Sequence, residues 1–560
     1  MVQFKPRTGL GPHPALRLGL GLALLLTTPC LATAHPGEGA VTVSTPTGAV
    51  AGVEIGQTRA FLGVPYAAPP VGPLRWAHPA PAPRWAGVRP ATTFAAKCPS
   101  QSWAPGGGMA GAEDCLYLNV YVPKHARGSA PVAVWLHGGG FTAGASQDVD
   151  PSRFVEKTGV VVVTVNYRLG ALGFASLPEL DAESPTHSSG NYALMDQQAA
   201  LGWVKHNIKA FGGDPARVTA IGESAGAFSI WSHIASPGAR GLFQRAITMS
   251  GPNSSFADGM PMVERSAEQT RGPSSRLAEA FGCARGPNLL ACLRAVPASS
   301  LVAAAASAQG WPGWTIILDG DVLPRQPRRM REAGKVARVP VLSGNTENEG
   351  GFFTLTRRLR PGGWTGDDYR KATLAAPSGD RILEAYPPLK QGSPDETYAA
   401  AVSDQWACGT RKIDAIYGRL AKVYAYEFAD RAAPPTLFAF PGAPVGAFHT
   451  AEIPYVFQTS YPMDLHRGPP AFSPAQAALS ERMLKAWGDF IWGRRPAAWP
   501  EFSRTGDTEI LAPEGDRALS SAAFGEKHNC RFWDTTLFGD WLVNTANLAR
   551  HQGAGRPGPD

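Results

Sequence analysis

Two short segments of the chain, Pro131–Leu136 and Gly159–Thr164, are almost entirely apolar. Because a strand that is covered on both faces is apolar throughout, these segments predict buried strands of a parallel sheet. Alternation of apolar and small polar residues between Val41 and Phe61, with glycine breaks, predicts small edge strands. Further strands are predicted at Val218–Ile221, Ala246–Met249, Val339–Leu342 and Val423–Phe428.

Apolar residues recur at helical spacing between Asn191 and Ala210, and Phe211-Gly212-Gly213 is expected to end this helix. Strands that alternate with helices predict an α/β fold. Two longer segments, Met262–Ser307 and Trp364–Ile416, have a helical and irregular pattern. We interpret both as insertions over the carboxyl edge of the sheet, where ligands bind in such folds.

The first 34 residues resemble an export signal. Lys5, Arg7 and Arg17 precede an apolar run at Leu18–Leu26, and Ala32-Thr33-Ala34 offers a cleavage site. The run is too short to span a membrane. We expect a signal peptide at 1–34, a single domain at 35–545, a disordered tail at 546–560, and a secreted or periplasmic product. A lipoprotein anchored through Cys30 is the alternative, which Pro29 disfavours.

The composition, with 44% hydrophobic and 17% charged residues, is ordinary for a globular chain with a large core. After the signal no dense Lys/Arg run occurs, which argues against a nucleic-acid partner. Two loose basic stretches, at 325–331 and 357–360, would suit carboxylated esters if they lined a pocket. A solvated face is the more usual explanation.

Seven cysteines are present, and removal of Cys30 with the signal leaves six. An even number in an exported chain favours disulfides, and the spacing does not suggest a zinc site. Pairing in chain order would close two short loops and one long loop. These pairs are Cys98–Cys115, Cys283–Cys292 and Cys408–Cys530.

The segment Gly222-Glu223-Ser224-Ala225-Gly226 follows a predicted strand and precedes a helix-prone stretch. This context is typical of a nucleophile elbow, a sharp turn that presents a serine hydroxyl. His137-Gly138-Gly139-Gly140 follows another predicted strand and exposes backbone N–H groups, as an oxyanion hole requires. Together these motifs predict a serine hydrolase with Ser224 as nucleophile, and we expect His137 to be a packing residue. The expected oxyanion donors are Gly139, Gly140 and Ala225.

With these motifs the chain resembles the type-B carboxylesterases, the family of para-nitrobenzyl esterases, cholinesterases and fungal lipases. Glu113–Pro123 matches one family signature, and Phe211–Gly226 matches the other with Ala220 as its one departure. The resemblance implies an α/β-hydrolase fold, with a large, mostly parallel central sheet, helices on both faces and helical insertions over the active-site edge. It also implies the three disulfides above, a small-molecule ester substrate, and no metal or organic cofactor.

The remaining catalytic residues are implied by the same resemblance. The family acid lies in G-x-N-x-x-E-G, and Gly344–Gly350 carries one extra residue. An alignment that keeps the Glu-Gly pair places the acid at Glu349, with Glu347 as the alternative. The motif at Gly446–Phe457 places the base at His449.

Residues that would support the catalytic acid or contact the substrate follow from the resemblance less directly. Ser250 matches a family serine and is expected either to bond the acid or to be a plain strand-end serine. Trp103 lies near the place of a choline-binding tryptophan, in a shorter loop, and a structural role is preferred for it. Trp311 and Trp314 are candidates for the acyl side of the site or for an aromatic core. The sequence identifies neither the ester nor the oligomeric state.

Two classes of function are compatible with these motifs. One is an exported carboxylesterase that forms an acyl-enzyme on Ser224, with broad substrates or specialised for polycarboxylate esters. The other is a non-catalytic, cholinesterase-like adhesion protein. The presence of Ser224, Glu349, His449 and the glycine loop favours the enzyme.

Overall fold

The computed structural model describes twelve ranges of the chain, all within the unit Gly39–Asp560. They are residues 41–101, 108–125, 128–252, 264–283, 286–308, 314–354, 364–376, 378–388, 393–435, 446–462, 470–496 and 498–536. No helix in these ranges is long and apolar enough to cross a bilayer.

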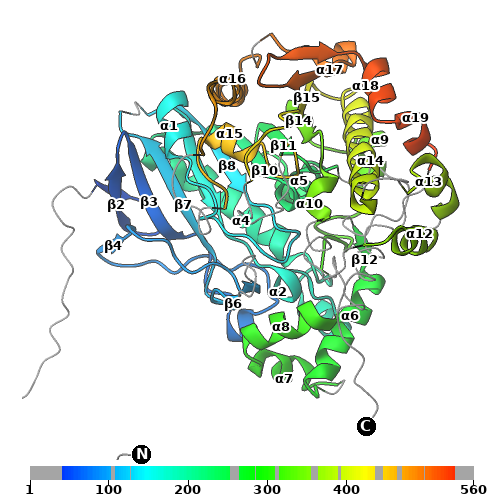
Figure 1. Cartoon of the computed structure of the whole chain (residues 1–560). Coiled ribbons are helices and arrows are strands. Elements are labelled where there is room, and N and C mark those ends of the chain that lie inside the picture. The colour runs from blue at the N-terminus through cyan, green and yellow to red at the C-terminus, as the bar shows by residue number, and fades with distance from the viewer. Residues whose placement is uncertain are drawn as a thin grey trace, which may run out of the picture. The chain divides into compact units, whose positions relative to one another are not determined.

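One 13-stranded sheet dominates the described part of the chain (Figure 1). Its order is β1-β2-β3-β7-β9-β8-β10-β11-β14-β15-β16-β17, and β4 pairs with β2. Neighbours from β9 to β16 are parallel, whereas the pairs at both edges are antiparallel apart from β2 with β4. The strands are β1 Val41–Ser44, β2 Ala49–Ile55, β3 Thr58–Pro65, β4 Val88–Pro90, β7 Tyr117–Pro123, β8 Ala130–Leu136, β9 Val161–Val165, β10 Gly213–Glu223, β11 Arg245–Met249, β14 Val341–Thr346, β15 Val423–Phe428, β16 Thr508–Leu511 and β17 Arg517–Leu519.

Helices cover both faces of the sheet, and each face has its own apolar core. In β8, Ala133 and Trp135 belong to one core, whereas Val132, Val134 and Leu136 belong to the other. Because alternate side chains of a strand point to opposite faces, this two-sided burial explains the continuous apolar run. One face carries α1 Ser152–Thr158, α15 Ile453–Phe457 and α16 Pro474–Ile491. The other carries α4 Tyr192–Asn207, α5 Ala225–Ala235, α9 Pro327–Glu332 and α14 Pro394–Tyr417.

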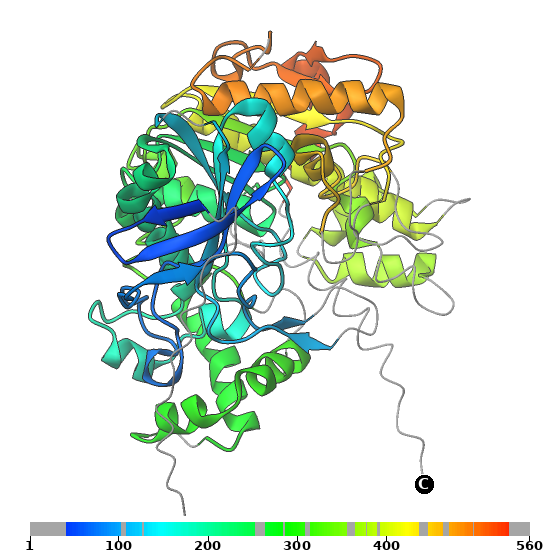
Figure 2. The same cartoon turned by 90° about the vertical axis from the view of Figure 1, so that its left-hand side faces the viewer.

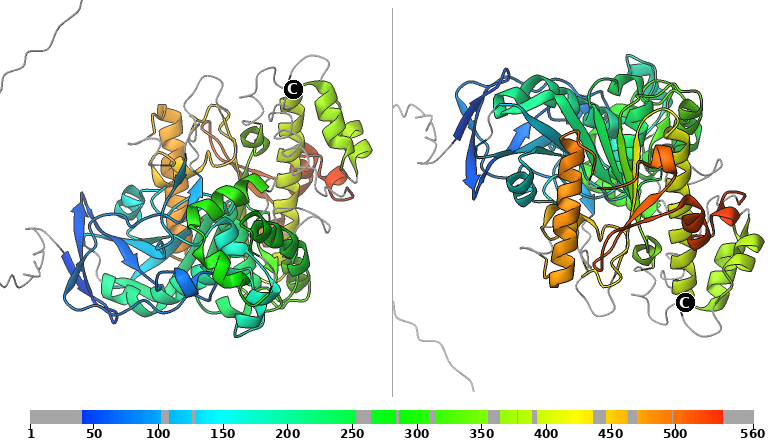
Figure 3. Two further views of the ribbon diagram at one scale, coloured as in Figure 1. Left: turned by 90° about the horizontal axis from the view of Figure 1, so that it is seen from below. Right: turned by 90° about the horizontal axis from the view of Figure 1, so that it is seen from above.

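The view from above shows α16 and α14 flanking the strands (Figure 3, right), and Figure 2 looks onto the edge formed by the blue N-terminal strands. The predicted α/β-hydrolase architecture is therefore confirmed. Two short strands at the opposite edge, β16 and β17, were not predicted, because three or four residues carry too little pattern to identify a strand.

The two predicted insertions have different outcomes. In the first, helix α6 Ala267–Ala280 packs on α8 Ala298–Ala308, and α8 packs against α2 Gly170–Phe174, which follows β9. Helix α7 Leu289–Ala295 contacts α3 Pro178–Glu183. The second prediction is partly wrong. Within it, α12 Gly366–Leu374 and α13 Gly379–Ala385 pack together, but α14 is the crossover between β14 and β15 and lies on the sheet.

All three expected disulfides are present: Cys98–Cys115, Cys283–Cys292 and Cys408–Cys530. The longest joins α14 to α19 Cys530–Trp533, across a sequence separation of 122 residues. The predicted signal peptide and tail lie outside the described residues.

Candidate active site

Strand β10 and helix α5 meet at Ser224, whose backbone has φ 53° and ψ −121°. Non-glycine residues adopt this region only under constraint. The constraint comes from both sides, because the Ser224 N–H donates to Met249 O (2.9 Å) and its carbonyl accepts from the Phe228 N–H (2.9 Å). A Cβ on Gly226 would lie 1.9 Å from Leu136 O, so glycine is needed where the turn meets β8. This geometry is that of a nucleophile elbow.

The glycine loop after β8 packs directly on this turn. A Cβ on Gly138 would approach Ser224 Cβ to 3.2 Å. Gly139 and Gly140 have φ values of 112° and 58°, which turn the loop sharply. Ala225 is the first residue of α5, and an N–H at that position has no partner within its own helix. The three predicted oxyanion donors therefore lie on two segments that touch at Ser224.

His449 and Glu349 meet at the same carboxyl edge of the sheet, although they are far apart in sequence. The Nδ1 of His449 donates to Oε2 of Glu349 (2.6 Å), whose other oxygen accepts from the Thr346 N–H (2.8 Å). Both side chains are buried. The alternative acid, Glu347, instead accepts two hydrogen bonds of 2.9 Å from Arg431. Geometry thus selects Glu349 as the partner of the imidazole.

Two further carboxyl groups lie beside this pair, and sequence reasoning assigned neither of them a role. Glu223 Oε1 lies 3.1 Å from Nε2 of His449. Burial, followed by the charge of Glu349, raises the pKa of Glu223 well above its ordinary value. Burial and the charges of Glu223 and Glu349 act in the same direction on the pKa of Glu452. Ser250 was expected either to bond the acid or to be a plain strand-end serine; its hydroxyl in fact donates to Glu452 Oε1 (3.1 Å).

His137, which precedes the glycine loop, is a packing residue as expected. Its ring is fully buried and stacks on Tyr167, with 4.2 Å between ring centroids. Burial lowers the pKa of His137 to about 4, so the ring is neutral at pH 7. The Tyr167 hydroxyl donates to His137 O (2.6 Å) and so holds the start of the loop. Sequence reasoning did not find this role of Tyr167.

Aromatic side chains surround the imidazole of His449. The ring centroids of Phe352, Phe353 and Trp406 lie 5.5, 5.6 and 5.4 Å from it. Phe353 and Trp406 also stack on each other. Sequence reasoning missed Trp406, because it lies within a helical segment and in none of the motifs that mark the site.

Among the residues that the structure describes, no tryptophan proposed from the sequence as a substrate contact belongs to the rings around His449. Trp314 is buried in the larger core, which is the position of a packing residue. Trp103 and Trp311 lie outside the described residues, so their predicted contacts stay predictions. In the basic stretch, Arg331 is buried over the Trp231 ring, and Arg328 pairs with Glu332. These two arginines have structural partners.

A mostly parallel sheet with an elbow serine and a His–Glu pair at its carboxyl edge is the fold of an α/β hydrolase. The profile of the Carboxylesterase family matches residues 39–533, and the chain belongs to this family. It is 33% identical to acetylcholinesterase of Bungarus fasciatus, over 92% of this chain and 90% of that protein. It is 36% identical to fumonisin B1 esterase of Sphingopyxis macrogoltabida, over 83% and 85%. A solved PNB esterase superposes with a TM-score of 0.73 at 30% identity, covering 87% of this chain and 99% of that chain. The protein is therefore a carboxylic ester hydrolase.

Proposed function

We propose that the protein hydrolyses carboxylic esters through an acyl-enzyme formed on Ser224. As the Ser224 oxygen attacks the ester carbonyl, His449 accepts the hydroxyl proton and then passes it to the leaving alcohol. Glu349 holds the imidazole in the productive tautomer and stabilises its charged form. Water, activated by the same base, then releases the acid. The proposed oxyanion donors are the N–H groups of Gly139, Gly140 and Ala225.

The buried hydrogen bond between His449 and Glu349 carries this proposal, because the other nitrogen of the same imidazole reaches Glu223, the residue that precedes the elbow serine. The contact of Nε2 with Glu223 fits the same mechanism. Burial and the charge of Glu349 raise the pKa of Glu223, so this carboxyl group competes less for the imidazolium than a carboxylate of ordinary pKa would.

The test is hydrolysis of p-nitrophenyl esters from acetate to octanoate by the mature protein, beside Ser224→Ala. We expect the variant to lose at least about a thousandfold in kcat/KM. Ser299→Ala, at an exposed position of α8, is the matched control and should keep full activity. A fluorophosphonate should phosphonylate Ser224 alone, adding the mass of the reagent less that of the HF released. Equal turnover by wild type and Ser224→Ala would refute the proposed nucleophile.

The aromatic rings around His449 favour uncharged acyl groups, so simple alkyl and aryl esters are the substrates we propose first. One relative is named for hydrolysis of fumonisin B1, and that compound belongs in the same panel. Preference for an acidic ester over p-nitrophenyl butyrate would contradict the assignment to uncharged esters.

We further propose that the protein is exported, with residues 1–34 as its signal peptide. Three disulfides support an oxidising compartment. Mass spectrometry of the product from an expressing bacterium should find His35 as the first residue. An intact Met1 on active protein would refute the cleavage.

A further inference from the structure

A chain of charged side chains runs from the C-terminal segment to the loop that holds the proposed catalytic acid. Lys527 closes α18 Ser521–Lys527, and its Nζ contacts Glu427 of β15 and lies 3.0 Å from Glu347 Oε1. Glu347 stands two residues before Glu349 on the loop after β14. Arg431, on the exposed side, completes the shell of Glu347. A lysine remote in sequence is thus salt-bridged to the acid loop.

The loop that holds the proposed acid, residues 347–349, is fixed by backbone hydrogen bonds on either side of Glu347. The Glu347 N–H donates to Phe428 O at the end of β15 (2.8 Å). The next residue, Asn348, donates its N–H to Ala447 O (2.8 Å), two residues before His449. The position of the Glu347 carboxylate is therefore coupled through three consecutive residues to the Glu349–His449 hydrogen bond.

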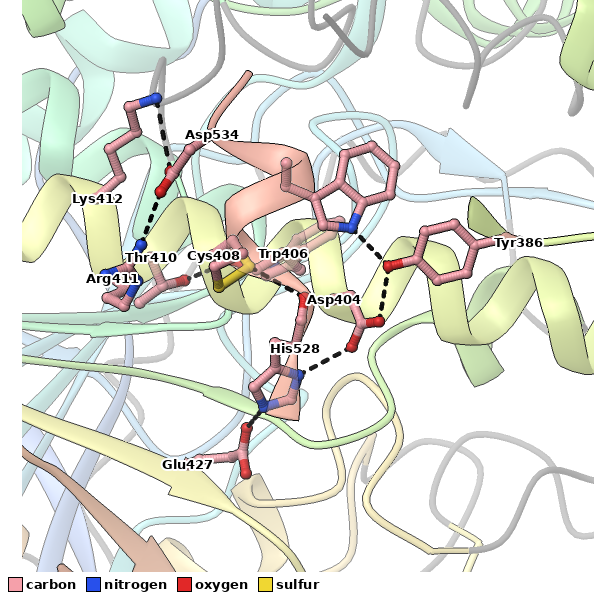
Figure 4. Close-up of a disulfide and its surroundings, with 12 residues drawn as sticks. Tyr386, Asp404, Trp406, Cys408, Thr410, Arg411, Lys412, Glu427, His528 and Asp534 are labelled. Carbon is pink, nitrogen blue, oxygen red and sulfur yellow. Dashed lines mark hydrogen bonds and ion pairs between the residues drawn. A yellow bond between two sulfur atoms is a disulfide. The ribbon is translucent and has the colours of Figure 1, made fainter. Parts of the chain in front are cut away.

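The residues that follow Lys527 are held in place by α14 and β15 (Figure 4). The next residue, His528, bonds Asp404 of α14 through Nδ1 (3.0 Å) and Glu427 through Nε2 (2.5 Å). The disulfide between Cys408 and Cys530 ties α19 to the same helix α14. Lys527 consequently reaches Glu347 from a segment that His528 and the disulfide fix to α14 and β15.

Resting on the proposed roles of Ser224, His449 and Glu349, we propose that Lys527 is a positioning residue for the reaction. It fixes Glu347, and through Glu347 the geometry of the Glu349–His449 pair. Burial would raise the pKa of Glu347, but the hydrogen bonds of Arg431 and the charge of Lys527 outweigh it and hold the pKa at about 2. Glu347 is therefore a full anion at working pH. Without Lys527, Glu347 keeps only the exposed Arg431 as a charged partner, while Glu427 keeps His528. The two carboxylates, no longer bridged by Lys527, then repel each other and push the loop from its place.

Lys527→Met tests this role, because methionine keeps the apolar stem and removes the charge. We expect kcat for p-nitrophenyl butyrate to fall by about tenfold, since small misplacements of catalytic groups are costly, while KM changes less than about twofold. Lys527→Arg should restore kcat to within about threefold. Lys412→Met is the matched control. Lys412 has the same 28% side-chain exposure as Lys527 and also pairs with the C-terminal segment, at Asp534, but does not contact the acid loop.

A double-mutant cycle of Lys527 and Glu347 tests whether Lys527 affects kcat through Glu347 rather than through a general loss of protein stability. If Lys527 acts through Glu347, Glu347→Gln should lower kcat similarly, and the double variant should lose no more than either single variant. Losses that multiply, or an unchanged kcat in a folded Lys527→Met protein, would overturn the proposal. If Lys527→Met does not fold, Glu347→Gln alone decides: an unchanged kcat in that variant overturns the proposal.

A readout independent of turnover distinguishes failure of this proposal from failure of the proposed function. The proton between His449 Nδ1 and Glu349 gives a far-downfield NMR resonance, assigned by its loss in His449→Ala. Lys527→Met should shift or broaden it, and Lys412→Met should not. If wild type hydrolyses no ester, the proposed function fails, yet an unmoved resonance in Lys527→Met would still refute the positioning role by itself.

Discussion

His528 makes the stability of the C-terminal segment depend on pH. Its side chain is 3% exposed and bonds two carboxylates, Asp404 and Glu427. Burial alone would lower the pKa of His528, but the hydrogen bonds and charges of the two carboxylates outweigh burial and raise the pKa to about 9. The folded protein therefore binds the His528 proton more tightly than the unfolded chain does.

The sign and size of the effect follow from linkage. The ordinary pKa of a histidine side chain is 6.5, so the stabilisation is fully present below about pH 6.5 and is lost as pH rises through 9. The difference between the two pKa values corresponds to about 3 kcal/mol in the free energy of unfolding at pH 6. At pH 9 less than about 1 kcal/mol of this contribution is left.

Urea unfolding of wild type and His528→Gln at pH 6, 7.5 and 9 measures this contribution. Glutamine cannot carry the charge, so the gap in unfolding free energy between the two proteins should shrink by about 2–3 kcal/mol from pH 6 to pH 9. Lys412→Met, whose ion pair with Asp534 is more exposed, should show no such change. A gap for His528→Gln that is equal at pH 6 and pH 9 would refute a charged, stabilising His528.

Three other predictions follow from packing. Gly226→Ala should abolish folding or activity, because the new Cβ would lie 1.9 Å from a backbone oxygen. In α4, the Cβ of Gly202→Ala meets nothing within 4 Å, so this variant should raise the free energy of unfolding by about 0.5–1 kcal/mol. Thermal unfolding of both variants checks these expectations. Replacing Cys408 and Cys530 by alanine should cost about 5 kcal/mol, since the bond closes a separation of 122 residues, and equal stability in urea would contradict this. Phe353→Ala should open space beside His449 and raise the octanoate-to-acetate ratio of kcat/KM by about tenfold, as measured with p-nitrophenyl esters.

Local features of the site were predictable because a few adjacent residues dictate them. The elbow needs glycine at 226, where the chain touches β8, and the loop at 139–140 needs residues that accept positive φ. The buried parallel strands were also predictable from the sequence. Successive side chains of β8 point into two different apolar cores, so nearly every residue of the strand must be apolar. In each case the structural requirement, a tight turn or burial on both faces, restricts the types of the adjacent residues themselves, so the sequence shows it directly.

Other features depended on contacts between distant segments, which no local pattern encodes. The family pattern placed the acid at Glu349 and left Glu347 as the alternative. The packed loops bring Glu349 to His449 and Glu347 to Arg431 and Lys527, contacts that the pattern does not contain. The assignment of α14 to an insertion was partly wrong because of this limit. A helix has an apolar face whether it packs on a sheet or on another helix, so its sequence does not identify its packing partner.

Local sequence was enough to specify the strand–helix alternation, the elbow at Ser224, the glycine loop and the six cysteines available for pairing. Tertiary packing alone settles which side chains share one buried space: Glu223 beside His449, Ser250 bonded to Glu452 across 202 residues, and Lys527 against the acid loop. Backbone turns and burial are imposed within a few residues, whereas ion pairs and hydrogen bonds between distant segments form only after the whole sheet has brought its loops to one edge.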